Sequence, residues 1–99
     1  MYKLKDFDQQ SVILQIERLC EIAQQLGYRI RYDYFGGSGG GPCEFSGKRW
    51  LFIDLALNSI ERLELLREAI VDEPAVEMLD LAASERDWLI GGQSKRRAA

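Results

Sequence analysis

The sequence predicts an α+β fold in which an N-terminal helix is followed by a three-stranded antiparallel meander and by two C-terminal helices packed on one sheet face. Two observations predict it. Apolar residues recur every three to four positions before Gly27 and again after Asn58, and every second position between them. A three-stranded sheet is marginally stable alone, so helices are needed to cover it.

The first helix is predicted within residues 8–26, and Gly27 follows at the position of a left-handed C-terminal cap. Cys20 lies on the apolar stripe of this helix, so we expect its thiol to be buried and unreactive. The stripe consists of Val12, Ile16, Leu19, Cys20, Ala23 and Leu26.

Three strands are predicted after this helix. Residues 28–35 alternate aromatic or aliphatic side chains with mostly charged ones, and the glycine-rich segment 36–42 must be a loop because it has almost no side chains to pack. Residues 43–45 and 49–55 flank the link Ser46–Lys48 and form a hairpin. Because both faces of the last strand are largely apolar, we expect it to be central or best covered.

Two helical segments are predicted to close the fold. Asn58 and Glu61 have the spacing of a capping box at the start of a helix over residues 59–72. Pro74 ends that helix and begins a further helical segment. Near Ser84 we expect this last segment to break and restart.

The length of the chain fits one domain. Of its 99 residues, 46% are hydrophobic, which suffices for one core. We expect a single domain over residues 1–90 and a flexible basic tail over residues 91–99. The N-terminus lacks an apolar run of signal-peptide length, and no stretch reaches the length of a membrane span. We therefore expect a cytoplasmic protein.

Composition excludes several kinds of chemistry. Histidine is absent, which excludes Ser-His-Asp, Cys-His and HExxH sites. Cys20 and Cys43 lack the CxxC spacing of a redox or zinc pair. A net charge of −3 argues against the basic surface of a general nucleic-acid binder. We expect no catalytic residue, no metal, no cofactor, no membrane contact and no nucleic-acid partner.

The glycine-rich loop is the first candidate site. Pro42 and a strand follow it, rather than a helix with a GK[ST] motif, so phosphate binding is disfavoured. A flexible connection is favoured, and a flap that grips a ligand or a partner is the alternative. Cys43 lies at the end of the loop, where Lys48 or Arg49 could activate its thiol. A structural cysteine is favoured over a reactive one.

A carboxylate row on the second helix is another candidate. Its members are Glu61, Glu64, Glu68 and Asp72. Because sites for calcium or magnesium draw ligands from loops or from several elements, a solvated helix face is favoured.

The aromatic residues of the strands are a third candidate. They are Tyr28, Tyr32, Tyr34, Trp50 and Phe52. Aromatic side chains at strand spacing favour a sheet-to-helix core. However, helices cannot easily cover both faces of so small a sheet, and an open apolar face predicts self-association. The least favoured alternative is contact with RNA or DNA through Arg29, Arg31, Lys48, Arg49 and the basic residues 95–97.

Several motifs occur in a recognisable order. They are Leu26-Gly27-x-x-x-Arg31-Tyr32, a glycine-rich loop ending in Cys43, Gly47-Lys48-Arg49, Ile53-Asp54 and a leucine-rich helix. The order resembles that of a group of short bacterial stand-alone proteins whose activity is not established. This resemblance covers roughly residues 12–75. It implies a small domain of shared architecture and supplies no substrate.

The order of elements is more remotely similar to the catalytic half of ImmA/IrrE-type zinc metallopeptidases, in which a helix and a short sheet precede a helix bearing HExxH. The matching stretch is Arg67–Val71, where only the glutamate, Glu68, survives. A glutamate without zinc has no metal-bound water to activate. The resemblance therefore implies a fold that is retained for binding and not for hydrolysis.

The sequence thus predicts a non-enzymatic domain that acts by protein association, as a homodimer or accessory subunit, through the aromatic sheet face or the glycine loop. The alternative is a small-molecule binder or a reactive-thiol protein that uses the loop Gly36–Cys43. The candidate site residues are Tyr32, Tyr34, Gly37, Gly40, Cys43 and Trp50.

Overall fold

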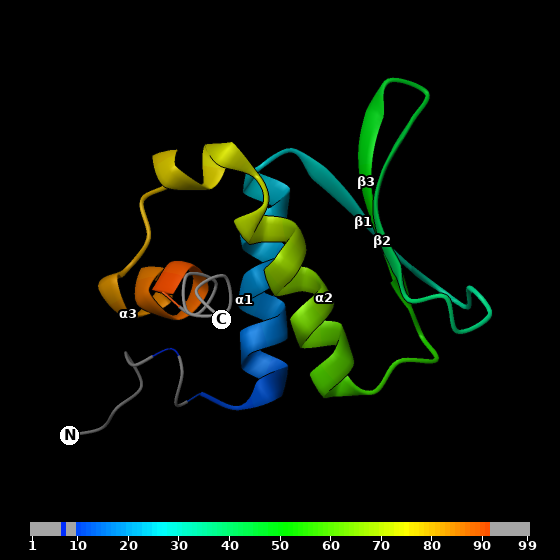
Figure 1. Cartoon of the computed structure of the whole chain (residues 1–99), viewed down its shortest axis with the longest axis horizontal. Coiled ribbons are helices and arrows are strands. Elements are labelled where there is room, and N and C mark those ends of the chain that lie inside the picture. The colour runs from blue at the N-terminus through cyan, green and yellow to red at the C-terminus, as the bar shows by residue number, and fades with distance from the viewer. Residues whose placement is uncertain (1–6, 8–9, 92–99) are drawn as a thin grey trace.

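The computed structural model describes residue 7 and residues 10–91, so residues 92–99 of the expected basic tail lie outside the described part. Figure 1 shows a small sheet with the helices on one side of it. The elements are α1 (Val12–Gln25), β1 (Tyr28–Asp33), β2 (Gly40–Phe45), β3 (Lys48–Asp54), α2 (Ser59–Val71), the 3-10 helix η3 (Pro74–Met78), α3 (Ala83–Arg86) and the π-helical turn η4 (Asp87–Gly91). The fold is α+β, as predicted.

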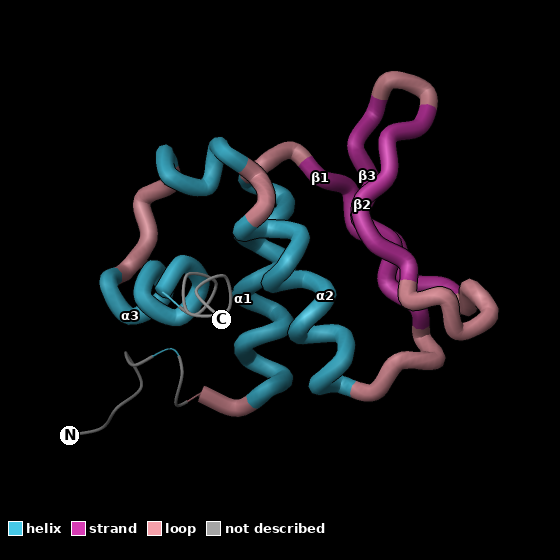
Figure 2. Tube along the Cα trace, viewed as in Figure 1, coloured by secondary structure: helices cyan, strands magenta, loops and turns pink. Residues whose placement is uncertain are grey.

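The sheet is mixed, so the predicted antiparallel meander is wrong. Its strand order is β1-β3-β2, with β1 parallel to β3 and β2 antiparallel to β3. After β1, the glycine-rich connection crosses to the other edge of the sheet, so that β2 pairs with β3 and not with β1 (Figure 2). The prediction that β3 is the central strand is confirmed.

Local turn chemistry explains the hairpin between β2 and β3. Ser46 and Gly47 both have positive φ, 55° and 74°, as a type I′ turn requires. Such a turn fixes the register that pairs Cys43 with Trp50.

Pro42 occupies a position in β2 that tolerates proline. The Asp54 N–H donates to Gly39 O, and the Leu55 N–H donates to Asp33 O, so alternate residues of β3 bond to β2 and to β1. By this alternation the backbone nitrogen of Pro42 faces the open edge of β2 and not β3. Its missing N–H therefore removes no hydrogen bond from the sheet.

The core lies between the sheet and the helices α1 and α2. Leu51 and Ile53 of β3 have no exposed surface, and neither do Leu19, Ile22, Leu66 and Ile70 of the helices. Ser11 caps α1 through a hydrogen bond from the Leu14 N–H. The predicted capping box of α2 is confirmed, since Asn58 Oδ1 accepts from the Glu61 N–H and Glu61 Oε1 accepts from the Asn58 N–H.

The third helical segment does not pack on the sheet face, which corrects the prediction of two C-terminal helices there. It breaks into three short pieces that lie against α1 and α2, on the side away from the sheet (Figure 1). The Arg18 guanidinium of α1 donates to both carboxylate oxygens of Glu85, with the longer contact at 3.0 Å. Phe7 is buried and meets Trp88 edge to face at 5.1 Å between ring centroids.

Arg49 ties the sheet to the helices. Its guanidinium donates to Leu26 O at 3.0 Å, stacks over the Tyr28 ring at 4.2 Å and pairs with Glu73. The contact joins the end of α1, two strands and the segment after α2. The Arg49 side chain therefore lies on the helical side of the sheet. Among the described helices, none has the length and apolar character needed to cross a membrane.

Replacing Gly40 with alanine is expected to lower the free energy of unfolding by about 3 kcal/mol or more. Gly40 has a φ of +89°, and a Cβ there would lie 2.2 Å from the carbonyl oxygen of Phe52. The control is Gly36→Ala, where φ is +70° and no atom lies within 4 Å of the added Cβ. We expect a loss of about 1 kcal/mol for the control. Urea unfolding followed by circular dichroism measures both, and equal losses would contradict the close approach.

Candidate functional site

A buried carboxylate holds the glycine-rich loop against the end of β3. Asp54 has no exposed surface. Its Oδ1 accepts hydrogen bonds from the N–H groups of Ala56 at 2.9 Å and Phe35 at 3.2 Å, and its Oδ2 accepts one from the Gly39 N–H at 3.2 Å. These bonds stabilise the charged form, so the pKa of the Asp54 carboxyl is lowered, first through the bond from Ala56 and then through those from the loop. Both ends of the loop are thus anchored.

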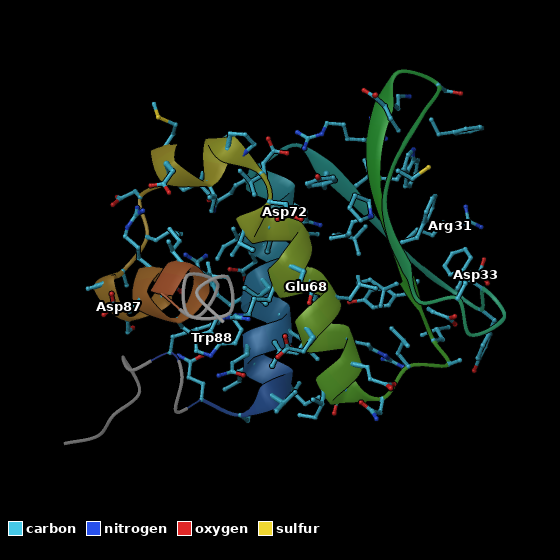
Figure 3. All side chains as sticks on the ribbon, viewed as in Figure 1. Arg31, Asp33, Glu68, Asp72, Asp87 and Trp88 are labelled. Carbon is cyan, nitrogen blue, oxygen red and sulfur yellow. The ribbon has the colours of Figure 1, made fainter. Side chains whose placement is uncertain are left out.

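None of the helices that the structure describes lies over the other face of the sheet. Figure 3 shows Arg31 and Asp33 on the side of the sheet that points away from the helices. Strand alternation and cross-strand register place further residues on that side. We call this surface the outer sheet face, and define it by Arg29, Arg31, Asp33, Phe35, Cys43, Phe45, Lys48, Trp50 and Phe52.

Aromatic rings form the centre of the outer sheet face. The rings of Trp50 and Phe52 stack with an interplanar angle of 8° and a centroid separation of 5.9 Å. Phe35 contacts Phe52 at 5.4 Å, and the Arg29 guanidinium lies 5.9 Å from the Trp50 ring. Phe45 at the end of the hairpin is 66% exposed. The surface is therefore apolar and aromatic at its centre and mostly cationic around it.

The structure separates the predicted site residues. Cys43 and Trp50 are a cross-strand pair on the outer sheet face. Tyr32 lies on the helical side, where its hydroxyl is 3.4 Å from the Cys20 sulfur. Tyr34 follows β1 and is 73% exposed. Gly37 is in the anchored loop, and Gly40 is the first residue of β2 rather than part of the loop.

The Cys20–Tyr32 contact has no charged form at neutral pH. Burial raises the pKa of the Cys20 thiol, and burial together with the hydrogen bond to Cys20 raises the pKa of Tyr32 to about 12. Cys20 is half-buried. Its position on the apolar stripe is as expected, but it is less buried than the sequence predicted.

A groove lies between the start of β2 and α2, on the helical side of the sheet. Its volume is about 510 Å³. Its lining residues are Gly39, Gly40, Gly41 and Pro42 from β2 and the residue before it, and Leu57, Ile60, Glu61, Glu64, Leu65, Glu68, Ala69 and Asp72 from α2 and the residues that flank it. We call it the α2 groove. The carboxylate row found in the sequence is one wall of this groove and not a helix face remote from other elements.

The sequence signals did not reveal the α2 groove because its two walls come from segments predicted separately. The glycine-rich segment and the carboxylate row were each identified, but their proximity follows from the placement of β2 at the sheet edge. In the described part of the chain, no group of three or more acidic or cysteine side chains is positioned to hold a metal ion.

The residues that match the HExxH helix lie on different sides of α2. Arg67 is buried and extends toward η4, where it donates to Trp88 O at 3.2 Å and stacks over the Trp88 ring at 4.8 Å. Its Nε has no hydrogen-bond partner among the residues that the structure describes. Glu68, in contrast, lines the α2 groove.

No protein-family model matches the chain, and neither a curated protein nor a solved structure matches it.

The Asp54→Asn variant is expected to be less stable than the wild type near neutral pH, with a smaller difference in acid. Because the folded pKa of Asp54 is lowered from its ordinary value of 3.8, its contribution is present above that value and is lost as the pH falls through the folded pKa. Urea unfolding of both proteins from about pH 7 down to about pH 2 measures this. A difference independent of pH would contradict a charged carboxylate in the folded protein.

The two thiols are expected to react with a thiol reagent such as Ellman's reagent at rates that differ by about tenfold or more. Cys43 is exposed, whereas burial raises the pKa of Cys20. The Cys20→Ser variant should retain the fast phase and the Cys43→Ser variant the slow one. Equal rates would contradict the placement of the two thiols, and a Cys43 rate above that of free cysteine would favour the reactive-thiol alternative.

Proposed function

We propose that the protein is a non-enzymatic association domain, and that the outer sheet face binds a second copy of the chain. The observation that carries the proposal is the one-sided cover of the sheet, in which no described helix lies over the stacked Trp50 and Phe52 rings. Aromatic side chains and arginine are enriched at the centres of protein interfaces. The absence of histidine from the sequence supports a role without acid-base catalysis near neutral pH.

A second copy suits this face because two sheets can pack face to face at about 10 Å with their aromatic side chains between them. The exposed ion pair between Arg31 and Asp33, at 3.3 Å, can be exchanged with the same pair across a two-fold axis. The remaining cations, Arg29 and Lys48, carry like charge in both copies. Their repulsion is screened by salt, so this dimer should become tighter as ionic strength rises. An acidic partner would give the opposite salt dependence.

The Phe45→Lys variant tests the proposal. Phe45 is 66% exposed on the outer sheet face, so its replacement should leave the fold intact. We expect a dimer for the wild type in sedimentation velocity and a dimer dissociation constant raised about tenfold or more in the variant, since the change removes an exposed aromatic side chain from the outer sheet face and adds a charge to it in both copies. The matched control is Met78→Lys, which adds the same charge at an apolar side chain that is 85% exposed on η3.

Two results would contradict the proposal. One is a wild-type protein that sediments as a monomer at all concentrations and salt levels. The other is an equal effect of Phe45→Lys and Met78→Lys on the dimer.

A second candidate function is the binding of a small molecule at the glycine-rich segment. The α2 groove favours it, because Gly39–Pro42 line the groove and its volume of about 510 Å³ lies in the range of ligand sites. Under this alternative the exposed Cys43 is incidental, since it lies on the outer sheet face and does not line the α2 groove.

A further inference from the structure

We propose that the open edge of β1 pairs in antiparallel with β1 of a second copy of the chain, so that the two sheets join side by side into one continuous sheet. This contact lies at the border of the sheet, whereas the proposed function uses its outer face, and it does not rest on that function. It is argued from the unpaired backbone of β1, the order of charges along the strand and the exposed tyrosines beside it.

β1 presents unpaired backbone groups at its open edge. In the strand order β1-β3-β2, no other described strand lies beside β1 on the side away from β3. The Leu55 N–H donates to Asp33 O, so the backbone of Asp33 faces β3. The backbone groups of successive residues alternate between the two sides of a strand. Those of Ile30 and Tyr32 therefore point to the open edge, where a further strand can bond to them.

The two edges of the sheet differ in their protection. β2 has Pro42 within it, and two glycines precede that proline. β1 has the sequence Tyr-Arg-Ile-Arg-Tyr-Asp, without proline or glycine, and its aromatic and β-branched residues favour strand pairing. Proteins protect sheet edges with proline, bulges or charge. Because β1 has only charge, the order of its charges determines which strand can pair with it.

The charges of β1 select one register with a second copy. When Tyr32 lies opposite Tyr32 of the second copy, Arg31 lies opposite Asp33 in both directions. A two-fold axis at Arg29, Ile30, Arg31 or Asp33 would instead place arginine opposite arginine or aspartate opposite aspartate. Opposite charges directly across a strand pair are stabilising, and like charges are destabilising. Arg31 and Asp33 already form an exposed ion pair within the chain, at 3.3 Å, so the two copies need only exchange it.

The same register covers two exposed tyrosines. Tyr32 is 44% exposed and Tyr34 is 73% exposed. Strand alternation places both on the helical side of the sheet, since Phe35 contacts Phe52 on the outer sheet face. Tyr32 then lies beside Tyr32 of the second copy, and Tyr34 lies beside Ile30 of the second copy. Aromatic and β-branched cross-strand pairs of this kind stabilise a sheet, so the register suits both sides of β1.

Disulfide cross-linking of the full chain tests the register. The background is Cys20→Ser/Cys43→Ser, which removes both free thiols. Tyr32→Cys in this background should form a covalent dimer with the oxidant diamide, because directly opposed residues have Cα atoms about 5.5 Å apart, within reach of a disulfide. The matched control is Tyr34→Cys, whose two copies would be about 14 Å apart along the strands. We expect at least about tenfold less cross-linking in the control.

Charge complementation in sedimentation velocity tests the pairing. Arg31→Asp alone and Asp33→Arg alone place like charges opposite each other twice, and each should raise the dimer dissociation constant about tenfold or more. An equimolar mixture of the two variants should restore a dimer within about threefold of the wild type, since each chain supplies the charge that the other lacks. A variant that had merely misfolded would not be rescued by mixing.

The cross-link distinguishes the edge from the outer sheet face. Charge exchange could occur at either contact, but in a face-to-face dimer the two Tyr32 positions lie on the sides of the sheets turned away from each other. Phe45→Lys lies on β2, at the other edge of the sheet, and should leave the yield of the Tyr32→Cys cross-link within about twofold.

Three results would overturn the proposal. They are a wild-type chain that sediments as a monomer at all concentrations, equal cross-linking of Tyr32→Cys and Tyr34→Cys, and an absence of rescue in the mixture. A wild-type dimer that Phe45→Lys dissociates, and that gives no Tyr32→Cys cross-link, would also overturn it while supporting the outer sheet face. The opposite pattern would support the β1 edge and contradict the outer sheet face.

Discussion

The Asp54 carboxylate is the contact on which the arrangement of the sheet depends. It is buried, and it is satisfied by backbone N–H groups from both the loop before β2 and the turn after β3. A buried charge without such partners would be costly in free energy. The loop N–H groups therefore stabilise the carboxylate, and the carboxylate holds the loop in place. The loop that this carboxylate holds leads into β2, one face of which meets α2 while the other joins the outer sheet face. Both candidate surfaces therefore border the segment that Asp54 anchors.

Local chemistry allowed much of the fold to be predicted. The cap at Gly27, the capping box at Asn58 and the hairpin turn at Ser46–Gly47 each depend on a few neighbouring residues, and all three are present. The strand order was predicted wrongly because it depends on the parallel pairing of β1 with β3, whose partners, such as Tyr28 and Arg49, are far apart in the sequence. In the sequence, Asp54 continues the outward-facing side of β3, and nothing in its neighbours indicates that it is buried.

The placement of the candidate site residues was also predicted only in part. Cys43 and Trp50 were both among the candidate site residues, and the hairpin register places them opposite each other. Tyr32 lies on the other side of the sheet, because strand alternation directs it to α1. The α2 groove could not be predicted, since its glycine wall reaches the carboxylates of α2 only when β2 is the edge strand. Aromatic content indicated an open face but not which rings form it.

Pro42 has a consequence for the size of any assembly. An unprotected strand border recruits further chains one after another and leads to fibrils. Pro42 lies in the middle of the edge strand β2 and has no backbone N–H. A further strand added to this edge would therefore lack one hydrogen-bond donor. The proposed contact through the flat aromatic surface differs in this respect, since a two-fold arrangement is complete after one partner has been added.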